Sequence, residues 1–400
     1  MTQAQAAFDP NAAEDVDFTL FVGGPLYQLL TRIGLIDGGL HRLTARIAWI
    51  VALTWLPLVA LTGAEGTLLI RPRAVSFLGD VECHARFLLA VPLLLIAERV
   101  VHERMRPIVA QFRTRELVGP EDLDRLDGAI RGAYRLRNSA LIEAALLAVV
   151  YVTSFVSAQY RYTSMFTASW YNRPGEHALS MAGMWFVFVS LPLFQFLLCR
   201  WYFRLAIWAG FLWRAAGLPL RLNALHPDKA GGLGFLGQSL SAFVPLAAAH
   251  GVIMAGYLAD RIFYSGDKLT DYKLVILAAV LALLGVFAGP LCLFVPLLAR
   301  TRRAGLREYG RVAQVYVRTF EQKWISGPPP DEEPLVGSGD IQSLADLANS
   351  YGVAESMRLT PISRTAVLQF VAATVAPIVP LLLTVMPAEK LASTLVRLVL

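Results

Sequence analysis

The sequence predicts an all-α membrane protein: a polytopic helical bundle of about seven spans whose helices extend into a cytoplasmic helical bundle. The 400 residues are 56% hydrophobic and only 16% charged, whereas an average soluble protein is about 25% charged. Mean hydropathy is +0.52. Crossing a bilayer takes about 20 apolar residues, and six uncharged runs approach or exceed that length: 47–64, 144–160, 178–199, 230–259, 274–299 and 365–388. This pattern excludes a soluble enzyme, a coiled coil and a disordered chain.

A seventh span is expected at 84–101, although its uncharged part, 87–97, has only 11 residues. We expect the flanking Arg86, Glu98 and Arg99 to extend it by snorkelling toward the headgroups. With this span included and the N-terminus inside, 26 of the 36 Lys and Arg residues lie inside and 10 outside. Cytoplasmic loops are enriched in Lys and Arg. We therefore expect a bacterial inner-membrane protein with a cytoplasmic N-terminus and a periplasmic C-terminus.

The chain divides by composition into alternating membrane and cytoplasmic segments. Helical periodicity continues beyond the spans after residues 199 and 299, and the charged stretch 120–138 is expected to merge with the third span. The acidic N-terminus lacks the basic region of a signal peptide. The expected segments are 1–45 (cytoplasmic tail and juxtamembrane helix), 46–101 (two spans), 102–138 (cytoplasmic helices), 139–299 (spans three to six, with a cytoplasmic loop at 217–237), 300–362 (cytoplasmic helices and a Pro-rich linker) and 363–400 (last span and periplasmic end).

Two spans carry small residues three or four positions apart, a spacing that lets helices approach closely in lipid. They are Ala247, Gly251, Ala255 and Ala259 in the fifth span, and Ala278, Ala282, Gly285 and Gly289 in the sixth. These stripes are expected to pack on each other or to form a homo-oligomer. The other expected partner is the lipid bilayer, anionic lipids included. Nucleic acid is not expected, because acidic residues interleave with the arginines.

The most unusual stretch is 225–237, LHPDKAGGLGFLG. Its glycines allow backbone angles that other residues resist. The fifth span starts close by, and free N–H groups at a helix start attract anions. The predicted site for an anionic headgroup or a phosphorylated ligand comprises Arg221, His226, Asp228, Lys229, Gly231, Gly232 and Gly234. The alternative is a tight turn in which Asp228 caps a helix.

Two ionisable residues fall inside predicted spans, Glu143 and His250. Such residues are costly in the membrane and often functional, and a proton-coupled carrier would use such a pair. The alternative is a single buried histidine bonded to a backbone carbonyl. No catalytic motif appears and no cofactor is expected. No metal site is expected either, because His226 and Asp228 supply only two ligands.

Three stretches carry a resemblance: LHPDKAGGLGFLG, REYGRVAQVYVRTFEQKW, and DIQSLADLANSYGVAESMRLTP with the closing APIVPLLLTVMP. Together they resemble an uncharacterised family of bacterial multi-pass inner-membrane proteins. The resemblance covers roughly the C-terminal half. It implies the location and no activity.

Three functions remain open at the level of sequence. Polar groups at depth, kinked spans and small-residue stripes favour a transport or channel-like protein with a cytoplasmic helical gate. The absence of catalytic motifs equally suits a non-catalytic membrane scaffold or accessory subunit. The third is an enzyme acting on a lipid headgroup at the loop 225–237. A water-filled route to His250, a packed interior, or a lateral opening at His226 would favour these three in turn.

Overall fold

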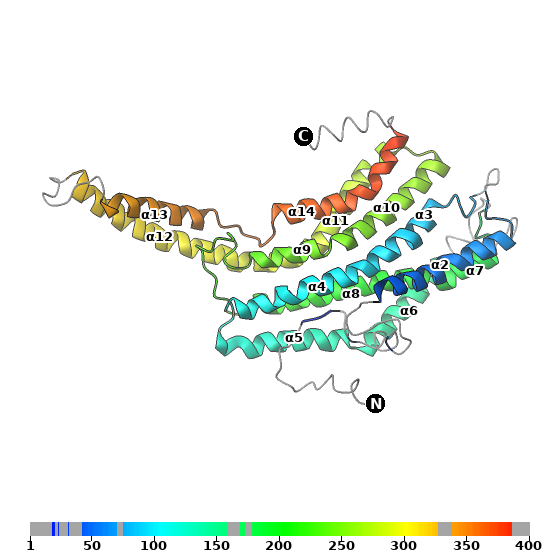
Figure 1. Cartoon of the computed structure of the whole chain (residues 1–400), viewed down its shortest axis with the longest axis horizontal. Helices are drawn as coiled ribbons and strands as arrows, with labels where there is room; N and C mark the ends of the chain where they lie inside the picture. Colours follow the sequence, from blue (N-terminus) through cyan, green and yellow to red (C-terminus); the bar gives the residue numbers. More distant parts are fainter. Residues whose placement is uncertain are drawn as a thin grey trace.

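The structure is a computed structural model that describes residues 18–20, 23, 31, 42–69, 75–157, 169–172, 178–326 and 338–385. This part of the chain is an all-α bundle without strands, in which long helices lie side by side (Figure 1). Most of the segment 158–177 between the third and fourth apolar runs, and the residues 327–337 that include the Pro-rich linker, lie outside the described residues. The described parts of all six apolar runs fall mostly on helices.

Several helical segments follow one another without a gap and form long rods, such as α3–η1–α4 over 81–114. Within most rods the α-helical geometry changes locally to a π or 3-10 turn, and most rods contain prolines. The elements are α2 (Leu43–Ala64), α3 (Val81–His84), η1 (Ala85–Ala90), α4 (Val91–Thr114), η2 (Pro120–Asp122), α5 (Leu123–Arg137), α6 (Ala140–Ser157), α7 (Met181–Trp185), η4 (Phe186–Ser190), α8 (Leu191–Ala216), η5 (Gly234–Gly237), α9 (Gln238–Ala242), α10 (Val244–Ser265), η6 (Leu269–Tyr272), α11 (Lys273–Ala288), η7 (Gly289–Phe294), α12 (Val295–Trp324), α13 (Gly339–Glu355), α14 (Arg364–Val375) and η8 (Ala376–Thr384).

Five helices in the described residues are long and apolar enough to cross a membrane: Leu43–Ala64, Met181–Ala216, Gly234–Ser265, Leu269–Trp324 and Arg364–Thr384. A sixth results if the bent pair α5 and α6 is counted as one span. The pair bends by 46°. The expected merger of 120–138 with the third span is therefore wrong, because the helix stops at Arg137 and restarts at Ala140.

The rod α3–η1–α4 is the central helix of the bundle, packed against α2, α8 and α10. It is the predicted seventh span, and its charges exclude it from the five above. Two of the three charges, Arg86 and Glu98, do not extend toward the headgroups as expected. Arg86 pairs with Glu82 one turn earlier, and Glu98 is buried in ion pairs with neighbouring helices. Only Arg99 is exposed, and it pairs with Glu103.

The two small-residue stripes have different surroundings. The stripe on α10 is buried, and a Cβ added to Gly251 would collide with the backbone of Thr374. On the other side of α10, Gly256 lies against Ala85 and Glu82. The stripe on α11 is exposed, and a Cβ at Gly285 would meet nothing within 4 Å. The stripes therefore do not pack on each other, and homo-oligomerisation through α11 stays a prediction.

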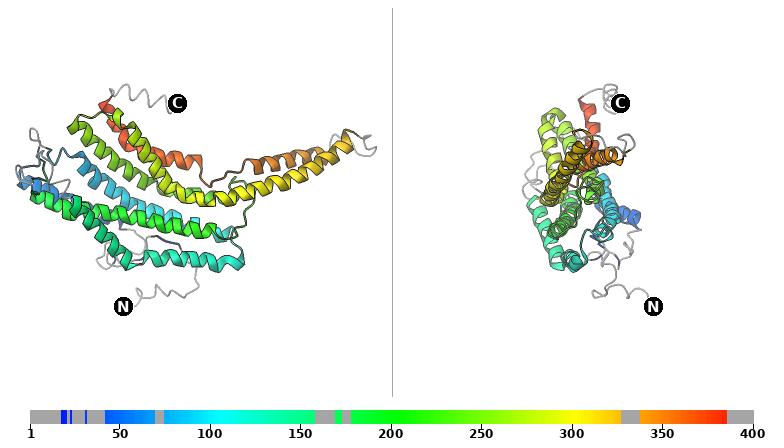
Figure 2. Two further views of the ribbon diagram at one scale, coloured as in Figure 1. Left: turned by 180° about the vertical axis from the view of Figure 1, so that it is seen from behind. Right: turned by 90° about the vertical axis from the view of Figure 1, so that its left-hand side faces the viewer.

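An arm of two helices, α12 and α13, projects from the body (Figures 1 and 2). At a rise of 1.5 Å per residue, α12 is roughly 45 Å long. Asp340 at the start of α13 fastens the tip, because its Oδ2 accepts hydrogen bonds from Lys323 Nζ and Trp324 Nε1, each at 2.8 Å. Very few residues of the arm are buried: Leu298, Gly305 and Ala354.

Candidate functional site

The loop between α8 and η5 adopts an unusual backbone. Lys229, Gly231 and Gly232 have φ of 55°, 64° and 98°, all in the left-handed region. Glycine adopts such angles at no steric cost, so the two glycines let the chain reverse tightly before η5. Lys229 reaches the same region with a side chain, which requires support from its surroundings.

Asp228 is the hub of this loop. Its Oδ1 accepts the backbone N–H of Ala230 at 2.8 Å and of Gly232 at 3.2 Å, and its Oδ2 accepts that of Gly234 at 2.8 Å. Nδ1 of His226 lies 2.9 Å from Oδ1. Burial alone would raise the pKa of Asp228, but these N–H groups favour the carboxylate and the pKa is lowered. The carboxylate thus occupies the place that an external anion would take.

The expectation of free N–H groups at the fifth helix is therefore wrong for Gly232 and Gly234. The two cations that were expected to assist do not converge on the turn either. Arg221 is exposed and lies 3.3 Å from Glu121 Oε1, and the Lys229 side chain is exposed. Asp228 instead binds the first N–H of η5, as in the alternative interpretation of a capped turn. The predicted anion site gains no support from these contacts.

The same loop holds the root of the arm. Arg358, just after α13, donates its backbone N–H to Lys229 O at 2.7 Å and its Nη2 to Asp228 O at 2.9 Å. Its Nη1 donates to Ile362 O at 3.0 Å. One side chain therefore links the loop, the end of the arm and the segment that leads into α14.

Close backbone packing completes this junction. A Cβ on Gly305 of α12 would collide with Ala224 of the loop. Gly231 lies against Met357 and Leu298, which are buried. The loop also reaches the α4–α5 connection, because Arg221 donates its backbone N–H to Leu117 O at 2.8 Å. We call residues 221–237 with Arg358 the bracket, since they join the arm to the body.

The structure does not bring Glu143 and His250 together. Glu143 Oε1 lies 3.7 Å from Arg200 Nη2. Nδ1 of His250 lies 2.8 Å from Leu246 O, and Nε2 lies 2.7 Å from the Tyr202 hydroxyl. A carbonyl only accepts, so Nδ1 carries the proton and Nε2 accepts from the tyrosine. This is the alternative of a histidine bonded to a backbone carbonyl.

A buried ion cluster escaped the sequence analysis. Glu98 on α4 accepts from Arg46 of α2 at 2.5 Å and from Arg204 of α8 at 2.6 Å. All three residues are at most 5% exposed. Arg200 lies one turn away on α8 and is buried too. Nε and Nη1 of Arg46 find no hydrogen-bond acceptor within the described residues.

The sequence does contain a signal for this cluster. Arg46, Glu98 and Arg200 each border an uncharged run on its predicted inner end. Because all three residues border the same predicted side of the membrane, they are expected at the same height in the bundle, where the arginines can pair with Glu98. The pairing was missed because Glu98 was expected to snorkel toward the headgroups and no role was predicted for Arg46 or Arg200. In the described residues, no group of three His, Cys, Asp or Glu side chains could hold a metal ion.

Comparisons with models of protein families, with curated proteins and with solved structures gave no match.

Proposed function

We propose that this protein is a non-catalytic membrane scaffold that presents the α12–α13 arm to a protein partner in the cytoplasm. The observation that carries the proposal is the bracket. The N–H groups of this turn, which could bind an anion, donate instead to the turn's own Asp228. The carbonyl oxygen of Asp228 accepts a hydrogen bond from Arg358, at the end of the arm that adjoins the body. The hydrogen bonds of the bracket therefore fix the position of the arm relative to the body.

The arm offers a surface for such a partner. Val312, Val315 and Val317 on α12 and Ile341 on α13 are 45–63% exposed. Charged residues flank the three valines, with Arg311 before them and Arg318 after them. Apolar groups within a charged rim are typical of protein–protein contacts. The two helices of the arm bury few residues between them. A partner would therefore cover apolar surface of the arm that the body does not contact.

Transport is less well supported by these contacts. A proton-coupled carrier needs ionisable groups that can take up and release protons along a path across the membrane. His250 has both ring nitrogens bonded within the protein, and Glu143 and Glu98 lie beside arginines. Paired groups of this kind hold helices together. An enzyme acting on a headgroup gains no support either, because His226 and Asp228 are engaged with each other.

For the membrane placement, we propose the bacterial inner membrane, seven spans, a cytoplasmic N-terminus and a periplasmic C-terminus. The distribution of arginines supports this orientation. The position of α3–α4 supports the seventh span, because apolar helices enclose it and its charges are paired. In this orientation the arm and the bracket lie in the cytoplasm.

The test uses a photo-crosslinking residue at Val315, on the arm, in cells that express the full chain. We expect a discrete crosslinked protein product, and none from the same residue at Arg125 on α5. Arg358→Ala should diminish the product while membrane insertion is retained, because the root of the arm is loosened. Absence of any product at Val315, combined with proton flux through proteoliposomes that His250→Phe abolishes, would favour a carrier and overturn the proposal.

A further inference from the structure

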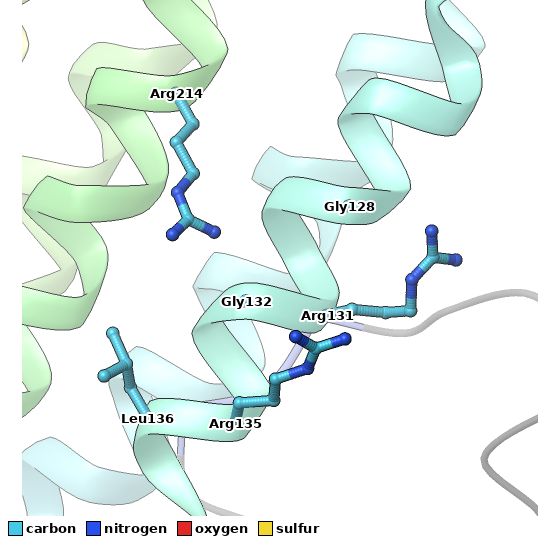
Figure 3. A pocket seen from close by; sticks show the side chains of 6 residues that line it. All are labelled: Gly128, Arg131, Gly132, Arg135, Leu136 and Arg214. Atoms are coloured by element: carbon cyan, nitrogen blue, oxygen red, sulfur yellow. The ribbon is translucent and has the colours of Figure 1, made fainter.

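A pocket of about 470 Å³ lies between α5 and the end of α8 (Figure 3). Its lining consists of Gly128, Arg131, Gly132, Arg135, Leu136 and Arg214. We propose that this pocket binds a phosphate-bearing anion. The site is separate from the bracket and from the buried ion cluster, and it goes beyond a scaffolding role.

The charge of the lining is one-sided. Three of the six lining residues are arginines and none is acidic. Neighbouring arginines have acidic partners: Arg113 pairs with Asp127, and Arg125 pairs with Asp122. In the part of the chain that the structure describes, the three pocket arginines make no such pair. Unpaired like charges in one pocket repel one another, and an anion relieves that repulsion.

The glycines of α5 shape the pocket. Figure 3 shows Arg214 reaching from α8 toward α5 at Gly132, and a Cβ on Gly132 would collide with its guanidinium. A Cβ at Gly128, one turn earlier, would meet nothing within 4 Å. Gly132 thus makes room for the Arg214 side chain, and Gly128 leaves open space beside it.

The three arginines come from two helices, Arg131 and Arg135 from α5 and Arg214 from α8. In Figure 3, Arg135 extends along α5 toward the base of Arg131, and the guanidinium of Arg131 points away from α8. Guanidinium groups bind phosphate oxygens through paired N–H donors. Arg214 and Arg135 can contact a phosphate group in the pocket, and Arg131 is free to close from the rim.

The position of the pocket fits two sources of phosphate. The rod Met181–Ala216 has 36 residues, which span roughly 54 Å, against about 30 Å for a hydrocarbon core. Its last turns, with Arg214, therefore stand beyond the apolar layer. The phosphate group belongs either to a soluble anion or to the headgroup of an anionic lipid. The shared chemistry is the phosphate, and the experiment separates the sources.

The experiment uses the full chain in nanodiscs and compares two triple variants. One removes the pocket arginines: Arg131→Ala, Arg135→Ala and Arg214→Ala. The control removes the same charge from the arm: Arg307→Ala, Arg311→Ala and Arg318→Ala. Inorganic pyrophosphate, measured by calorimetry in phosphatidylcholine nanodiscs, probes the soluble source. Spin-labelled phosphatidylglycerol in equal mixture with phosphatidylcholine probes the headgroup source.

We expect one of the two probes to bind the natural chain and the arm variant alike, and the pocket variant roughly tenfold more weakly or worse, as for loss of charged hydrogen bonds. Gly132→Ala should weaken binding without removing charge, because its Cβ displaces Arg214. This variant and Arg135→Ala alone keep the test valid if the triple variant fails to fold. Equal binding by the natural chain and the pocket variants, or no binding of either probe, would overturn the proposal.

Discussion

Glu98 on α4 accepts a hydrogen bond of 2.6 Å from Arg204 on α8, and both side chains are buried. Arg46 of α2 donates to the other carboxylate oxygen at 2.5 Å. One carboxylate therefore ties three helices together. Removing charges from water is expensive, and the cost is offset only while each charge keeps its partners.

Glu98→Ala should lower the free energy of unfolding by about 3–5 kcal/mol, because it leaves two buried arginines without their carboxylate. Denaturant unfolding of the detergent-purified protein measures this. The matched control is Arg99→Ala, which breaks the exposed pair with Glu103 on the same helix. That pair should contribute at most about 1 kcal/mol. Similar losses in the two variants would refute the structural role of the buried cluster.

Asp228→Asn should destabilise the bracket by about 1–3 kcal/mol at neutral pH, because the amide replaces one acceptor oxygen by a donor. The pKa of Asp228 in the fold is lowered below its usual 3.8. Its stabilising contribution is therefore complete above the unfolded pKa and disappears as the pH falls through the folded pKa. Unfolding measured between neutral pH and pH of about 2 should show the variant and natural curves converging at the acid end. A gap that stays constant with pH would contradict this.

The sequence predicted the rods and not the pairings between them. Apolar runs located the helices that are long and apolar enough to cross a membrane, and helical periodicity predicted that α8 and α12 continue beyond those runs, because both signals are local. The Asp228 carboxylate is one contact that the sequence could not predict. Glycines and a helix start indicate an anion site, and only the folded loop shows that the anion is internal. The cluster around Glu98 depends likewise on contacts between residues up to 106 positions apart.

Gly251→Leu and Gly285→Leu form a matched pair on α10 and α11, two helices that follow one another in the chain. The first should disrupt folding, because the added side chain would collide with the Thr374 backbone where α10 packs on α14. The second should leave the monomer intact, because nothing lies within 4 Å of Gly285. Thermal unfolding in detergent compares them. Equal tolerance of leucine at both positions would contradict the α10–α14 packing.

The Gly285 variant also tests association through α11. If the exposed stripe mediates a homo-oligomer, a leucine there should keep helices apart and shift the particle toward monomer in size-exclusion chromatography with light scattering. An unchanged oligomeric mass would remove the stripe on α11 as the contact.

The last prediction concerns whether the charged rod α3–α4 crosses the membrane. It contains Glu82, Arg86 and Glu98, which exclude it from the apolar spans, yet it packs against α2, α8 and α10. A helix whose charges pair with neighbours need not expose them to lipid. If it spans, Val118 after α4 lies in the cytoplasm and Gly66 after α2 lies in the periplasm. Alkaline phosphatase fused after Gly66 should then be active, and phosphatase fused after Val118 inactive. A fluorescent protein, which matures in the cytoplasm, should give the opposite pattern. Active phosphatase at Val118 would mean that α3–α4 does not cross, and every later segment would change sides.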